Sequence, residues 1–117
     1  MSNNKNQKFD LEERTAIFGE ETIKFLRLLK QSSITKSLTN QLIRSATSVG
    51  ANYMEADGAE SKRDFRHKIA LCKKEAKETK HWLRMIAIAT PENKDGCKKL
   101  WKEAQELTLI FSAILRK

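Results

Sequence analysis

The sequence predicts an all-α protein that folds as an up-down-up-down antiparallel four-helix bundle. Four segments repeat apolar residues at alternating steps of three and four, which is the spacing of one face of a helix. The connections between these segments are short, so successive helices are expected to be antiparallel neighbours. The 117 residues include only four Gly and one Pro, which leaves little material for hairpins.

The chain is expected to hold one domain. Residues 10–117 suffice for a single hydrophobic core, because domains most often have about 100–150 residues. Residues 1–9 are polar and lack the apolar stretch of a signal peptide, so we expect a flexible N-terminal leader. The longest stretch without charge, Ser45–Met54, is far shorter than the roughly 20 residues that span a bilayer. Two cysteines without a CxxC pair complete the prediction of a cytoplasmic protein that makes no membrane contact.

The first half of the chain is predicted to form two amphipathic helices. The first should begin at Asp10, whose carboxylate can cap free backbone amides together with Glu13. The second should cover residues 35–56, with Thr35 or Ser33 as its cap. The expected inward positions are Leu11, Phe18, Thr22, Phe25 and Leu29 in the first helix, widened by Leu26 and Leu28, and Leu42, Ala46, Val49, Tyr53 and Ala56 in the second.

The second half carries the clearest pattern. A third helix should start after Ser61, which can cap it with Asp64, and end before Pro91. Its seam alternates steps of four and three throughout, which is typical of knobs-into-holes packing, and a fourth helix repeats the pattern. The two seams are Phe65, Ile69, Cys72, Ala76, Thr79, Leu83 and Ile86, followed by Cys97, Leu100, Ala104, Leu107, Phe111 and Ile114.

The net charge of +8 is unevenly distributed. Between Glu60 and Thr90 there are nine Lys or Arg against four Asp or Glu, whereas residues 10–31 hold four against five. This excess favours a polyanionic partner, although net charge also serves solubility. Five of the cations form a stripe on the third helix at steps of seven, four, three and four: Arg66, Lys73, Lys77, Lys80 and Arg84.

The basic stripe has two interpretations. Charged residues normally cover exposed helix faces, so the stripe can be ordinary solvated surface. Alternatively, it follows a nucleic-acid backbone and binds RNA or DNA with salt-sensitive affinity and little sequence choice. No helix-turn-helix and no RNA-recognition sheet is evident in the sequence. The second interpretation therefore predicts contacts with phosphates and not with base edges.

A further set of large side chains lies outside the predicted seams. Leu71, Trp82 and Met85 share another side of the third helix, and Trp101 and Leu109 lie outside the seam of the fourth. A wide core can absorb these residues. Alternatively, they form a subunit interface, where aromatic residues and Met are enriched. The many small residues of the second helix favour the second possibility, which is self-association.

Enzymatic chemistry finds little support. Glu78-x-x-His81 and Asp64-x-x-His67 resemble the pairs of di-iron bundles, but both lie on one helix and opposite its seam, so no metal or other cofactor is expected. Cys72 falls in the seam as a buried core residue. Cys97 opens the fourth helix, where the helix N-terminus can lower its pKa, but no general base is near in the sequence. We therefore expect no enzyme.

The segment 44–56, Arg-Ser-Ala-Thr-Ser-Val-Gly-Ala-Asn-Tyr-Met-Glu-Ala, resembles the second-helix signature of the four-helix-bundle proteins encoded in intervening sequences of 23S ribosomal RNA genes. Asp64-Phe65, Ile69-Ala70 and 75–79 are similar to the third helix of that family. The resemblance extends from about Phe18 to Leu115. This chain departs from the family in having Ala56 where Gly is frequent, and in a more basic third helix.

The resemblance implies a bundle that assembles into a homopentameric ring. It also implies similarity to the accessory variability determinant of diversity-generating retroelements, a basic barrel that associates with nucleic acid and with a reverse transcriptase. For most of the family no activity is established. By this resemblance, Asn52 and Glu55 are expected to be structural or interface groups. The functional alternatives are thus a nucleic-acid-binding homo-oligomer and a protein-interaction adaptor with no nucleic-acid role.

Overall fold

The structure, a computed structural model, describes the backbone of residues 3–117 and the side chains from Leu11 onward. Met1 and Ser2, which belong to the expected leader, lie outside the described residues. The described chain is all-α and contains four α-helices and one short 3-10 helix, with no strand. These elements are α1 (Asn3–Leu26), α2 (Ser33–Asp57), α3 (Lys62–Ala89), η1 (Pro91–Asn93) and α4 (Lys94–Arg116).

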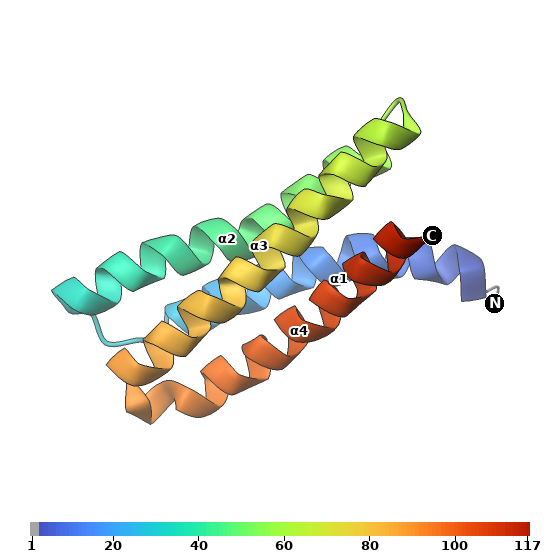
Figure 1. Ribbon diagram of the computed structural model, residues 1–117. Coiled ribbons are helices and arrows are strands. Elements are labelled where there is room, and N and C mark those ends of the chain that lie inside the picture. Colours follow the sequence, from blue (N-terminus) through green and yellow to red (C-terminus); the bar gives the residue numbers. More distant parts are fainter. Residues whose placement is uncertain (1–2) are drawn as a thin grey trace.

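The four helices form a bundle in which α3 is the best-packed member. Its contacts with α2 and α4 are the most extensive, whereas α1 packs mainly on α2 and much less on α4. Figure 1 shows the chain turning back at each connection, so that the beginning of α1 and the end of α4 lie toward the same end of the bundle. These contacts are compatible with the predicted antiparallel order. None of the described helices is long and apolar enough to cross a membrane.

The predicted cores are confirmed. Every seam residue expected in α3 and α4 is buried except Phe65 and Ile114, which are half-buried, and all five inward positions of α2 are buried. Among the inward positions expected in the first helix, Phe18, Thr22 and Leu26 of α1 are buried, as is Leu29 just beyond its end. The steps of three and four therefore identified the inward face of each helix correctly.

Three boundary predictions are wrong. Helix α1 begins at Asn3 instead of Asp10; whether residues 1–9 are flexible stays a prediction. It ends at Leu26, so Leu28 lies in a turn with its side chain 75% exposed and does not widen the core. The cap of α2 is Ser32, not Ser33 or Thr35, because its hydroxyl oxygen accepts the backbone N–H of Thr35 at 3.1 Å. Ser61 caps α3 as predicted, accepting from Asp64 N at 3.0 Å.

The limited contact between α1 and α4 includes two local interactions, an ion-pair cluster and the packing of an aromatic ring on a glycine. The Arg14 guanidinium donates to both carboxylate oxygens of Glu103 at 2.7 and 2.8 Å and to Glu106 at 3.2 Å. These bonds raise the pKa of Arg14 above its usual range. Near the start of α4, the Phe25 ring packs against Gly96, where a Cβ atom would lie 2.3 Å from Phe25 Cε1. Gly96 is thus needed because the ring occupies the space of a side chain.

Gly96→Ala should destabilise the fold, since Phe25 must leave its site. Overpacking costs about 1–3 kcal/mol, which exceeds the gain of roughly 0.5–1 kcal/mol from replacing Gly by Ala within a helix. The midpoint of thermal unfolding should therefore fall by several degrees. The matched control is Gly19→Ala, whose Cβ would meet Thr47 at an ordinary 3.7 Å, so its midpoint should stay or rise. Equal midpoints for the two variants would contradict the packing role of Gly96.

Candidate nucleic-acid interface

Two members of the predicted basic stripe, Arg66 and Lys80, contact α4 and help to hold the two helices together. Arg66 donates to the carbonyl oxygens of Leu115 at 2.6 Å and Lys117 at 3.4 Å. These carbonyls belong to the last turn of α4 and its C-terminal flank, where free acceptors and the helix dipole favour a cation. Arg66 is therefore already engaged within the protein.

Lys80 is also engaged. Its ammonium group donates to the side-chain oxygen of Gln105 and lies 5.2 Å from the centre of the Trp101 ring, a cation–π arrangement. Lys73 is half-buried. Of the five predicted residues, only Lys77 and Arg84 are exposed.

A basic face that shares Lys77 and Arg84 with the predicted stripe lies on the outside of α3. Eight positions, again at steps of four and three, are all exposed, and none carries a carboxylate. All but Arg63 lie two residues before a buried position, and Arg63 precedes the half-buried Phe65. Two residues rotate a helix by about 200°. The face contains four cations and two histidines. We call it the outer α3 face; its members are Arg63, His67, Ala70, Lys74, Lys77, His81, Arg84 and Ile88.

The cations of this face are available. No ion pair joins Arg63, Lys74, Lys77 or Arg84 to any other described residue. Lys74 and Lys77, with Lys73, surround a shallow hollow above the small side chain of Ala70. Three lysines that line one hollow can donate to a phosphate, which accepts hydrogen bonds through several oxygens. Arg63 and Lys74 are absent from the predicted stripe, although their spacing from the seam distinguishes them as outward positions.

The residues expected at an oligomer interface make contacts within the chain. Asn52 is half-buried and donates its side-chain amide to Ser48 O at 2.9 Å. Glu55 is exposed and accepts from Lys68 at 2.7 Å. These bonds are local to α2 and to the α2–α3 pair, which accords with a structural role. Leu71, Trp82 and Met85 are half-buried.

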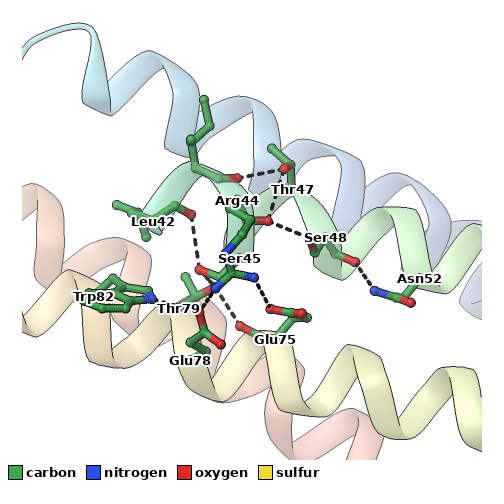
Figure 2. A network of polar contacts seen from close by, with 11 residues as sticks. Leu42, Arg44, Ser45, Thr47, Ser48, Asn52, Glu75, Glu78, Thr79 and Trp82 are labelled. Carbon is green, nitrogen blue, oxygen red and sulfur yellow. Dashed lines mark hydrogen bonds and ion pairs between the residues drawn. The ribbon is translucent and has the colours of Figure 1, made fainter. Parts of the chain in front are cut away.

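Trp82 belongs to a polar network between α2 and α3, shown in Figure 2. Its indole N–H donates to Glu78 at 2.9 Å, and Glu78 also pairs with Arg44 of α2. Arg44 reaches Glu75 as well, at 3.3 Å. The ring itself packs against the buried core. Trp82 is thus held between two helices and is not an exposed patch.

Beneath this network lies a buried pair of hydroxyls. The Oγ atoms of Ser45 and Thr79 are 2.9 Å apart, and both residues are fully buried. Backbone carbonyls lie within reach of both, at 3.2 Å from Ser45 to Leu42 O and 2.8 Å from Thr79 to Glu75 O. Each hydroxyl has one hydrogen, so the pair and the carbonyls share two donors. This part of segment 44–56 therefore serves the packing of α2 on α3.

Nucleophilic and metal chemistry gain no support from the described residues. Burial raises the pKa of Cys72 to about 12 and that of Cys97 to about 11. The expectation that the N-terminus of α4 lowers the pKa of Cys97 is therefore wrong, because desolvation of the thiolate dominates. No group of three or more His, Cys, Asp or Glu within the described chain is placed to hold a metal ion.

Trp82→Ala should destabilise the monomer fold by about 2 kcal/mol, less than the 3–5 kcal/mol of a fully buried ring, since Trp82 is half-buried. Urea unfolding followed by circular dichroism measures this loss. Ile88→Ala removes a side chain that is 77% exposed and should change the free energy of unfolding by less than about 0.5 kcal/mol. An unchanged stability of Trp82→Ala would show that the ring contributes to a surface and not to the core.

Comparisons with known proteins agree with this architecture. A solved crystal structure from Bacteroides thetaiotaomicron, described as a protein with unknown function from the S23 ribosomal protein family, is 26% identical and superposes with a TM-score of 0.79. The match covers 92% of this chain and 99% of that one. Comparison with curated proteins gives no match. Residues 7–113 match the family of 23S rRNA-intervening sequence proteins, and the chain belongs to that family.

Proposed function

We propose that this protein is a non-enzymatic, homo-oligomeric, up-down-up-down four-helix bundle that binds RNA or DNA through phosphates. The observation that carries the proposal is the outer α3 face, in which eight exposed positions in helical register hold four cations and no carboxylate. Its length from Arg63 to Ile88 is about 37 Å at 1.5 Å per residue. A straight ridge of this length can follow several phosphates along one backbone.

The proposed phosphate contacts come from the outer α3 face and not from the whole of the predicted stripe. Arg66 and Lys80 hold α3 against α4 and Lys73 is half-buried, so Arg63 and Lys74 take their place beside Lys77 and Arg84. No ion pair with another described residue fixes these four side chains. Such mobility suits binding to a repeating charge and not the reading of bases. Assembly strengthens the effect, because several ridges on one particle raise the avidity without new contacts. The family resemblance implies that the assembly is a homopentamer, and the sequence composition favours a location in the cytoplasm.

The adaptor hypothesis relied on Trp82 and Met85 as an exposed grip for another protein. Both side chains are half-buried, and Trp82 is bonded to Glu78. That specific surface is therefore not the basis of our proposal. A protein partner such as a reverse transcriptase is compatible with nucleic-acid binding, because such an enzyme shares the same nucleic acid.

The test is binding to short labelled single-stranded RNA and duplex DNA between about 50 and 200 mM salt. The variant Lys74→Glu, Lys77→Glu, Arg84→Glu should bind at least tenfold more weakly. If three phosphate contacts are lost, the slope of log affinity against log salt should become shallower by roughly 2–3. The oligomeric mass in the same buffers should not change.

The matched control reverses three exposed cations elsewhere, Arg27→Glu, Lys30→Glu and Lys36→Glu. Both triple variants lower the net charge from +8 to +2, since each reversal removes two charges. Only the α3 variant should lose its salt-dependent binding. Equal losses would assign the binding to net charge alone. An intact oligomer without binding at the lowest salt would contradict the nucleic-acid proposal and leave the adaptor hypothesis.

A further inference from the structure

The outer surface between α1 and α2 is hollowed into an apolar groove. Its floor consists of small residues from both helices, and larger apolar side chains stand at its two ends, Ile23 on α1 and Met54 on α2. Carboxylates from α1 border it. The lining residues are Glu12, Glu13, Thr15, Ala16, Gly19, Glu20, Ile23, Thr47, Gly50, Ala51 and Met54.

The groove exists because the two helices approach closely. A Cβ atom at Gly50 would lie 3.3 Å from the backbone oxygen of Thr15, which is tighter than an ordinary contact. Ala16 and Ala51 are exposed and add almost no side chain above the helix backbones. The segment 44–56 thus has three faces: one in the core, one bonded to α3, and one that forms this groove.

The charge of the groove is opposite to that of the protein. Three glutamates line it, and no Lys or Arg is among its described lining residues, although the chain has 23 cations against 15 acids. None of Glu12, Glu13 and Glu20 forms an ion pair with another described residue. The occupant that fits is therefore a helix face that combines cations with a large apolar side chain.

The outer face of α4 has this composition. Lys98 and Lys102 are exposed and have no ion pair within the described chain, and Leu109 follows two turns later with 57% of its surface exposed. Trp101, beside Lys102, is 39% exposed. The outer α3 face has more cations, but between Arg63 and Arg84 its apolar member is only Ala70. It is better suited to phosphates than to an apolar groove.

We infer that the groove between α1 and α2 binds the outer face of α4 from a second copy of this chain. Glu13 and Glu20 would pair with Lys98 and Lys102, and Leu109 would enter the space above the small residues. The two contacting surfaces differ, so the contact is head-to-tail, which closes a ring when its rotation permits. The outer α3 face stays free for phosphates. The inference rests on the homo-oligomer of the proposed function.

Charge reversal tests the pairing. Glu13→Lys with Glu20→Lys, and separately Lys98→Glu with Lys102→Glu, should each weaken association at least tenfold, measured by light scattering on a size-exclusion column. The chain that carries all four substitutions has the original net charge and reversed charges on both surfaces. Its mass should return to that of the unmodified protein. The nucleic-acid variant of α3 serves as a control whose mass should not change.

Each other outcome is decisive. An unmodified protein that is monomeric contradicts the homo-oligomer itself. An oligomeric protein whose mass is unaffected by both double variants overturns this interface alone. If both double variants have a lower oligomeric mass and the fourfold variant does not recover it, the two surfaces do not contact one another. Circular dichroism checks that each variant is helical, and Leu109→Ser, which alters an exposed position without changing charge, should also weaken association.

Discussion

The buried seam of α3 is the constraint on which the rest of this bundle depends. Its residues from Ile69 to Ile86 pack against α2 on one side and α4 on the other, and these are the two most extensive helix contacts. Because the seam repeats at steps of four and three along the whole helix, it fixes the rotation of α3 about its own axis. Burial of such apolar surface is the main favourable term in folding. The rotation of α3 then determines which of its other residues face α2, α4 or solvent.

One consequence is the outer α3 face. Seven of its eight members precede a seam residue by two positions, so they turn about 200° away from the core and point to solvent. Lys74 precedes Ala76, and Lys77 precedes Thr79, both of which are fully buried. Residues on the neighbouring side of the helix, such as Lys80, face α4 instead and help to hold the two helices together. The difference between a structural and an available lysine is thus a rotation of a few tens of degrees.

The inward faces could be predicted from the sequence because they depend on spacing within one helix. The side on which a helix meets its neighbour depends on tertiary packing, which is why Arg66 and Lys80 were assigned to a free stripe while Arg63 and Lys74 were missed. Leu28 was misplaced for a related reason: the periodic pattern continues past Leu26, where the helix ends. The groove between α1 and α2 requires two helices at a close distance, and Gly50 alone does not reveal it.

Charge is separated across the molecule in a way that limits how copies can associate. The surface between α1 and α2 is acidic, whereas the outer faces of α3 and α4 are basic. Like surfaces therefore repel one another, which disfavours a symmetric pair that would bring two acidic grooves or two α3 faces together. A contact between an acidic groove and a basic face is attractive between every pair of successive copies in the assembly. If α4 supplies that basic face, each added copy leaves another α3 ridge exposed, so assembly and phosphate binding strengthen one another.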